Sequence, residues 1–207
     1  EAEVHLILDE VFVAFGRLGT MLVCAQEGVQ PDFLCLAKGL TGGYLPLAAT
    51  MTTKEICAVF EGPYDEHRTL YHGHTFTANP LAASVALRNV ELLEKDMDDG
   101  LVADISDIFG KQVEQCFGKH SCVGQVRQRG LACCLDLCPP NRSFESYPKE
   151  RRVGLEVCLE ARQRGVLLRP LGNSIPLIPP ILVRPEEIEI LCIALRDALD
   201  TTLQKGI

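Results

Sequence analysis

The stretch "LCLAKGLTGGYLPLAAT", residues 34–50, joins a short apolar run to a lysine, three glycines and a proline. The run "FLCLA", residues 33–37, is uninterrupted and is followed closely by Gly39, which predicts a short buried strand. Lys38 therefore stands where this strand ends. Because strand ends usually meet water, Lys38 is either the first exposed residue beyond the sheet or an amine that the sheet presents to a ligand.

Residues 1–96 are expected to form part of an α/β domain. The runs "VHLIL", residues 4–8, and "LPLAATMTT", residues 45–53, predict two further strands. Continuous apolar runs such as "VHLIL" and "FLCLA" are typical of parallel strands that are covered on both faces. Asn79 and Pro80 then provide the N-cap and the first residue of a predicted helix that ends near residue 96.

Residues 97–207 have the pattern of a smaller α+β domain. Helices are predicted over residues 101–117, 149–164 and 185–204, the last of them opened by Pro185. Strands are predicted over residues 122–128, 131–137, 166–170 and 174–180.

Composition limits the classes of protein to consider. The chain has 207 residues, 47% of them hydrophobic, which is enough for a sizeable core. Its net charge of -8, with acidic and basic residues interspersed, argues against binding to nucleic acid or to an anionic membrane surface. No apolar stretch is long enough to cross a bilayer, and no signal peptide is visible. The ten cysteines form no CxxC pair and stand in apolar runs or helical segments, so we expect reduced core residues of a cytoplasmic protein.

Asp9 ends the first predicted strand just as Lys38 ends the second. In a parallel sheet both residues would emerge at the carboxyl edge, where open α/β sheets bind ligands. An amine and a carboxylate suit pyridoxal phosphate, because the amine can hold its aldehyde as a Schiff base and the carboxylate can keep its ring nitrogen protonated. The alternative is a buried Asp-Lys ion pair, which is costly unless it has a task.

The glycines that follow Lys38 permit two interpretations. Gly39, Gly42 and Gly43 would allow tight turns and the close approach of a flat ring, or they belong to an ordinary loop.

The stretch "HGHTF", residues 72–76, precedes the helix that Asn79 opens. Its two histidines have no nearby Cys, Asp or Glu partners, so we expect no metal there. A Gly-His-Thr turn before a helix can instead offer backbone N–H groups and the Thr75 hydroxyl to a phosphate. Arg169, at the end of another predicted strand, either offers a bidentate guanidinium to a substrate carboxylate or is an ordinary surface arginine.

Three motifs carry a resemblance to a known family. "LILDEVFVAFGRLGT", "PDFLCLAKGLTGGYLPLAAT" and "HGHTFTANPLA" resemble, in that order and spacing, the signatures of class III, fold-type I pyridoxal-phosphate aminotransferases. The resemblance spans essentially the whole chain and implies the end of the large mixed-sheet α/β domain, residues 1–96, followed by the C-terminal α+β small domain, residues 97–207. Family chains are longer. The opening "EAEVHLILDEV", without an initiator methionine, also suggests the back part of a longer chain.

The resemblance implies roles for four residues around the cofactor. Lys38 would be the Schiff-base lysine and later the proton carrier between substrate and cofactor, and Asp9 would pair with the pyridinium nitrogen. His74 and Thr75 would hold the phosphate of the neighbouring subunit in a homodimer. Family members more often have a smaller or different residue where His74 stands, so this side chain would contact phosphate only through its backbone or ring.

The resemblance also implies a substrate site. Gly73 would lie beside the substrate, Arg169 would bind its carboxylate, and Arg17 would line the pocket. "AKGLTGGYLPLAAT" is most similar to members that act in biotin biosynthesis and transfer the amino group of S-adenosylmethionine to 8-amino-7-oxononanoate. The alternatives are another ω-amino-acid aminotransferase, acting on ornithine, acetylornithine or 4-aminobutyrate, or a half-chain without activity of its own.

Overall fold

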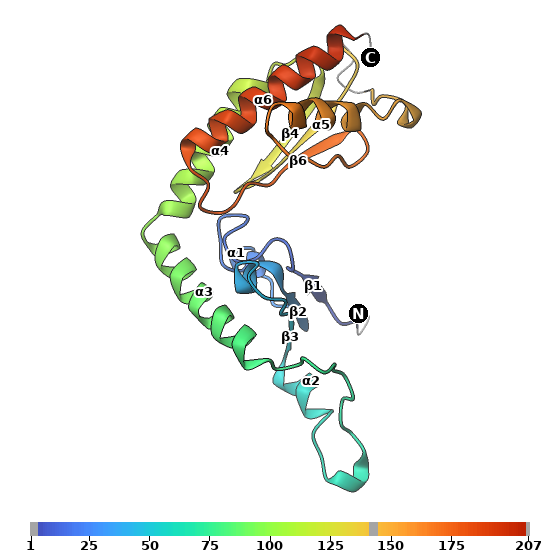
Figure 1. Ribbon diagram of the computed structural model, residues 1–207. Coiled ribbons are helices and arrows are strands. Elements are labelled where there is room, and N and C mark those ends of the chain that lie inside the picture. The colour runs from blue at the N-terminus through green and yellow to red at the C-terminus, as the bar shows by residue number, and fades with distance from the viewer. Residues whose placement is uncertain (1–3, 141–144, 206–207) are drawn as a thin grey trace. The chain divides into compact units, whose positions relative to one another are not determined.

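The computed structural model describes residues 4–140 and 145–205 (Figure 1). The chain divides between Asp99 and Gly100 into two compact units, which we call unit 1 and unit 2.

Unit 1 contains a three-stranded mixed sheet of β1 (Ile7–Asp9), β2 (Phe33–Leu36) and β3 (Ala49–Thr52), in that order. Strands β1 and β2 are parallel, with Asp9 opposite Cys35, whereas β3 runs antiparallel to β2. All three predicted strands are present but shorter than expected. Strand β3 begins only at Ala49, and the preceding Pro46 has no N–H group to offer a sheet partner.

The longest helix of unit 1 follows from a recognisable start signal. The helices of this unit are α1 (Val23–Gln26), α2 (Lys54–Ala58) and α3 (Pro80–Asp98), with 3₁₀ turns η1 (Lys38–Thr41) and η2 (Tyr64–Glu66). The Asn79 side chain accepts a hydrogen bond of 3.0 Å from the Leu81 N–H, and Pro80 is the first residue of α3. This confirms the predicted start of the longest helix in unit 1.

Unit 2 is an α+β arrangement around an antiparallel sheet. Its elements are α4 (Leu101–Phe117), β4 (Val123–Arg129), β5 (Ala132–Leu137), the 3₁₀ turn η3 (Lys149–Arg151), α5 (Val153–Gln163), β6 (Ser174–Leu177) and α6 (Pro185–Gln204). The strand order is β4-β5-β6, and both pairs are antiparallel.

One predicted strand of unit 2 is wrong. Residues 166–170 form no strand, and only Leu171 makes an isolated bridge, to Ser174. The apolar residues of this segment predict a strand, but Gly172 and Asn173 turn the chain directly into β6 and Pro170 cannot donate to a ladder. Helix α5 also begins at Val153 instead of residue 149, because Arg152 has a left-handed backbone (φ 49°) that separates it from η3.

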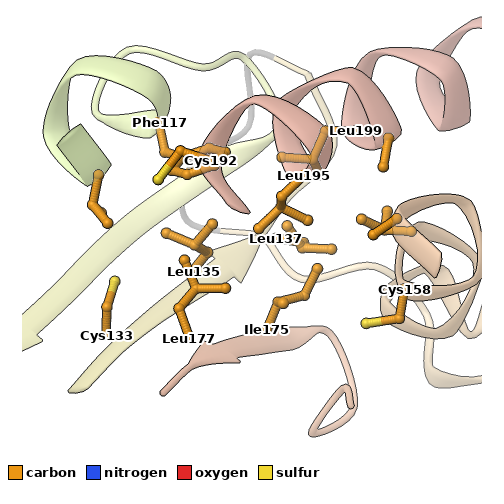
Figure 2. Packing of buried hydrophobic residues seen from close by; sticks show 14 of the residues in the cluster. Phe117, Cys133, Leu135, Leu137, Cys158, Ile175, Leu177, Cys192, Leu195 and Leu199 are labelled. Atoms are coloured by element: carbon orange, nitrogen blue, oxygen red, sulfur yellow. The ribbon is translucent and has the colours of Figure 1, made fainter. Parts of the chain in front are cut away.

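The core of unit 2 lies between the sheet and its three helices. Alternate residues of β5 face this core, as period-2 strand geometry requires, and α4, α5 and α6 supply the opposing side chains. Figure 2 shows Leu135, Leu137, Ile175 and Leu177 of the sheet together with Cys192, Leu195 and Leu199 of α6 and Phe117 of α4.

The cysteines contribute to packing, as predicted. Six of the ten are buried, and all ten are free thiols. Burial raises the pKa of Cys133 and Cys192 to about 12 and that of Cys158 to about 11, which keeps these thiols protonated. They therefore behave as small apolar side chains of the core.

Candidate active site

Unit 1 contains an open pocket of about 890 Å³ around the end of β2. Its lining includes Lys38, Thr41 and residues 43–48, together with His74 and Phe76 from the segment that precedes α3. The structure thus brings two of the predicted site residues, Lys38 and His74, to one pocket, although they lie far apart in the sequence.

Lys38 has an unusual backbone at the end of β2. Its φ of 42° lies in the left-handed region, which costs a residue other than glycine roughly 1 to 2 kcal/mol. This conformation turns the chain out of the sheet and into η1, which closes at Gly42, also left-handed. The lysine is therefore held at a sharp corner of the backbone, the kind of strained position that clusters at functional sites.

Asp9 occupies the corresponding end of β1. Because β1 and β2 are parallel, Asp9 and Lys38 both lie at the carboxyl edge of the sheet, as the sequence predicts. Asp9 is exposed, and its Oδ1 accepts a hydrogen bond of 2.9 Å from the Val11 N–H. Within the described part of the chain the two residues form no ion pair, and both are exposed, so the alternative of a buried Asp-Lys pair is wrong.

Phe12 is a neighbour of Lys38 that the sequence analysis missed. The Lys38 Nζ lies 5.6 Å from the centroid of the Phe12 ring, within the range of a cation–π contact. Phe12 stands three residues after Asp9. An aromatic residue so close to the end of the first predicted strand could have pointed to it.

Two further residues shape the loops at this edge. The buried carboxylate of Glu10 accepts hydrogen bonds from the N–H groups of Val23 (2.8 Å) and Cys24 (2.6 Å), which anchors the loop after β1 to the start of α1. The buried Thr41 hydroxyl donates to the Leu45 carbonyl at 2.6 Å. In the sequence, Thr41 could have been found as a short polar residue within a glycine-rich loop. Nothing in the sequence shows that Glu10, and not Asp9, is the buried acid.

The turn around His74 is largely satisfied by its own side chains. The His74 N–H donates to Thr77 Oγ1 at 2.8 Å, and the Phe76 N–H donates to His74 Nδ1 at 3.1 Å. Among the described residues, no hydrogen bond involves Thr75, which is exposed. The Thr75 hydroxyl and N–H therefore make no other hydrogen bond in the described part of the chain. Neither Thr75 nor Gly73 lines the pocket.

The two predicted arginines lie elsewhere. Arg17 is half-buried in the loop between β1 and α1, and burial lowers the pKa of its guanidinium. It does not line the pocket of Lys38. Arg169 belongs to unit 2, where it is exposed and precedes Pro170, so its role at the site of unit 1 stays a prediction.

In residues 4–140 and 145–205, no group of three or more His, Cys, Asp or Glu side chains is arranged to hold a metal ion. No helix in the same residues combines the length and the apolar character that crossing a membrane requires.

Comparisons with known proteins agree with this geometry. Residues 1–199 match the family model of class-III aminotransferases. The chain is 42% identical over 199 residues to an adenosylmethionine-8-amino-7-oxononanoate aminotransferase of Geobacter sulfurreducens, which covers 96% of this chain and 44% of that protein. A protein of the same name from Methanocaldococcus jannaschii is 41% identical over 203 residues, covering 96% of this chain and 44% of that protein. The chain thus spans less than half the length of these curated relatives.

Solved structures support the same fold. The crystal structure of the Methanocaldococcus jannaschii enzyme superimposes with a TM-score of 0.89 at 41% identity, covering 96% of this chain and 46% of that one. An amine transaminase from an uncultivated Pseudomonas species gives 0.85 at 35% identity, covering 96% and 45%. These matches confirm the predicted fold class. On the evidence of the family model and of this shared fold, the chain belongs to the class-III aminotransferase family.

Proposed function

We propose that this chain supplies part of a pyridoxal-phosphate-dependent aminotransferase of biotin biosynthesis, which transfers the amino group of S-adenosylmethionine to 8-amino-7-oxononanoate and yields 7,8-diaminononanoate. The observation that carries the proposal is Lys38 at the carboxyl edge of the sheet, in a chain that is 41% to 42% identical to several proteins named for this reaction. We place the protein in the cytoplasm as a homodimer.

The residues predicted for the site fit the cofactor by their chemistry. Lys38 provides a primary amine, Asp9 a carboxylate at the neighbouring strand end, and Thr75 a hydroxyl without another partner in the described chain. When bound, pyridoxal phosphate supplies an aldehyde that amines attack and a ring that withdraws electrons from a substrate carbon. An amine, a carboxylate and a hydroxyl are the groups that its aldehyde, its ring nitrogen and its phosphate require.

Lys38 would transfer one proton, and Asp9 would keep another in place. The Lys38 amine would act as the base that removes a proton from the substrate carbon and the acid that returns it, which requires it to stand at the pocket surface with its neutral form accessible. Asp9 would hold a proton on the ring nitrogen, and its hydrogen bond from the Val11 N–H orients the carboxylate for that task. Phe12 would restrict the Lys38 side chain from one direction.

The remaining predicted residues would bind the anionic groups. Thr75, with His74, would hold the phosphate in the site of the neighbouring subunit, with Gly73 beside the substrate. Arg169 would bind the carboxylate of 8-amino-7-oxononanoate through both guanidinium nitrogens. Arg17 lies outside the pocket of Lys38, so we assign it no role there.

A lysine substitution tests the cofactor assignment. The purified protein, expressed with any coding sequence upstream of Glu1, should show a visible absorption band with pyridoxal phosphate, and borohydride reduction should leave the cofactor on Lys38. Lys38→Ala should abolish both, whereas Lys54→Ala, at the exposed start of α2, should leave both unchanged. A reducible lysine adduct that survives in Lys38→Ala would show that another residue carries the cofactor.

A second candidate is another aminotransferase of the same family. The 35% identity to an amine transaminase favours it as an alternative, because such an enzyme would share Lys38, Asp9 and Thr75. Product analysis separates the two. We expect formation of 7,8-diaminononanoate with S-adenosylmethionine as donor; a protein that used ornithine, acetylornithine or 4-aminobutyrate and ignored S-adenosylmethionine would contradict the proposal.

The third candidate is a half-chain that is inactive alone. It is favoured by the coverage of 44% of the curated relatives. Residues 1–207 should be assayed alone and together with any coding sequence that lies upstream of Glu1. Activity only in the longer protein would place the rest of the site upstream, whereas activity of residues 1–207 alone would exclude the half-chain interpretation.

A further inference from the structure

Asn89 connects α3 to the turn that carries Lys38. Its Nδ2 donates hydrogen bonds to two consecutive backbone carbonyls, those of Gly39 (2.7 Å) and Leu40 (3.2 Å), the two residues directly after Lys38. Both partners are acceptors, so the amide must face them with its nitrogen. Asn89 is half-buried and stands 50 residues from Gly39 in the sequence.

The other atoms of the Asn89 amide are also in close contact with the turn. A Cβ atom built on Gly42 would lie 2.6 Å from Asn89 Oδ1, so only glycine leaves room for the amide at this point. Gly42 itself has a left-handed backbone, and its N–H donates to the same Gly39 carbonyl at 3.1 Å. One amide group thus contacts η1 at its beginning and at its end.

The turn is held from a second side by Phe15. A Cβ atom on Gly39 would lie 2.9 Å from Phe15 Cβ, and Phe15 is buried with a left-handed backbone of its own. Gly39 is therefore enclosed between Phe15 and Asn89. A strained residue persists only where its surroundings determine its conformation, and these contacts surround the backbone that follows the strained Lys38.

We infer that Asn89 is a positioning residue for Lys38: its amide holds η1 against α3, and thereby keeps the lysine at the corner from which its amine reaches the pocket. This inference rests on the proposed function for the use of the amine, but the contact itself does not depend on any cofactor. The ring of Phe12, which approaches the lysine amine, cannot replace this contact, because it has no donor to offer to the Gly39 and Leu40 carbonyls.

The first experiment examines the cofactor-free protein. Hydrogen exchange should be measured by mass spectrometry on peptides that cover residues 38–45. Asn89→Ala should accelerate exchange in this segment by about tenfold, which corresponds to about 1.4 kcal/mol. Ser84→Ala is the matched control, since it removes a side-chain hydrogen bond of the same helix, to the Pro80 carbonyl, and should leave the segment unchanged. Unchanged exchange in Asn89→Ala would overturn the inference.

The second experiment adds pyridoxal phosphate to the same proteins. Asn89→Ala should weaken cofactor binding by about tenfold and lower the fraction of Lys38 that borohydride traps, with a melting temperature near that of Ser84→Ala. Asn89→Asp should bind the cofactor more weakly still, because a carboxylate of the same shape would face two carbonyl oxygens. Asn89→Gln keeps the amide and should recover part of the lost cofactor binding. If Asn89→Ala does not fold, the comparison of Asn89→Asp with Asn89→Gln decides the question.

The outcomes separate this inference from the proposed function. Faster exchange with wild-type cofactor binding in Asn89→Ala would overturn the positioning role. Wild-type exchange and wild-type cofactor binding in Asn89→Asp would also overturn the positioning role, because they would show that only the shape of the side chain matters. A wild-type protein that forms no reducible adduct would overturn the proposed function, while the exchange experiment would still decide whether Asn89 holds the turn.

Discussion

Helices α3 and α6 are almost equal in length, at 19 and 20 residues, yet they bury their apolar side chains to different extents. Helix α3 buries two alanines and Leu93, and Leu81 is 71% exposed. Helix α6 buries a continuous stripe that includes Leu195 and Leu199 against the sheet of unit 2. Both helices begin with proline and carry apolar residues at helical spacing, so the difference arises from what each one packs against.

The same contrast extends to the two units. Every residue of the large buried cluster belongs to unit 2, whose antiparallel sheet offers one complete apolar face. The sheet of unit 1 has strands of three or four residues, and apolar side chains such as Ile7 and Phe76 remain exposed. Exposed apolar residues in such number are typical of surfaces that contact other protein. Unit 2 therefore has the packing of an independent domain, whereas the candidate pocket around Lys38 lies in the unit with the less complete core.

Separating the units should give the largest effect. We expect residues 100–207 alone to unfold in a cooperative thermal transition, because their core is complete. Residues 1–99 alone should show no such transition, because they bury too little apolar surface on folding. Circular dichroism and calorimetry of the two fragments measure this. A cooperative transition of residues 1–99 would break the comparison.

Matched leucine substitutions in the two helices should differ next most. Leu195→Ala, at a fully buried position of α6, should lower the free energy of unfolding by about 2 to 5 kcal/mol. Leu81→Ala in α3 should change it by less than about 0.5 kcal/mol. Urea denaturation checks both values. A large loss for Leu81→Ala in the purified protein would show that this side chain is covered there, which would locate a contact surface on α3.

Two helical glycines in unit 2 test how rigid its packing is. A Cβ atom on Gly154 of α5 would lie 2.3 Å from the Gly172 carbonyl oxygen, which belongs to the backbone and cannot rotate away. Gly154→Ala should therefore destabilise the protein by about 1 to 3 kcal/mol. A Cβ atom on Gly110 of α4 would meet only the end of the Gln128 side chain, at 3.2 Å, so Gly110→Ala should be neutral or stabilising by up to about 1 kcal/mol. Equal effects on the melting temperature would show that unit 2 adapts more easily than its buried core suggests.

The smallest expected effect depends on pH. Arg127 donates two hydrogen bonds to Asp136 across β4 and β5, at 2.8 and 3.0 Å, and this interaction lowers the pKa of the Asp136 carboxyl; the Ser174 hydroxyl adds to the same effect. A carboxyl whose pKa is lower in the folded state stabilises the fold above its unfolded pKa and loses this contribution as the pH falls toward the folded value. Asp136→Asn should cost about 1 kcal/mol at pH 7, a modest value because Arg127 is half-exposed.

That difference between wild type and Asp136→Asn should shrink as the pH falls below about 4, the ordinary pKa of an aspartate. Denaturation midpoints measured between pH 7 and pH 2.5 follow the change. A difference that stayed constant over this range would mean that the Asp136 charge contributes nothing to the stability of unit 2.

Much of the fold could be predicted from local patterns. The strand before Lys38, the N-cap of α3 at Asn79 and the helices of unit 2 all follow from apolar spacing and end signals within a few residues. The segment 166–170 shows the limit of this approach. Its composition is that of a strand, but a strand exists only where another segment pairs with it, and pairing is not encoded in the five residues themselves.

The candidate site divides in the same way. From its residues alone, the sequence determined that a carboxylate and an amine stand at the ends of two strands, because side-chain chemistry and strand ends are local properties, and the family motifs lie along the same segments. The pairing of the folded backbone decided that these two strands are adjacent and parallel. Only the tertiary structure decided that Phe12 lies beside the amine, that Glu10 and not Asp9 is the buried acid, and that Asn89 holds the turn. These contacts join segments up to 50 residues apart, and the folded backbone alone brings them within reach.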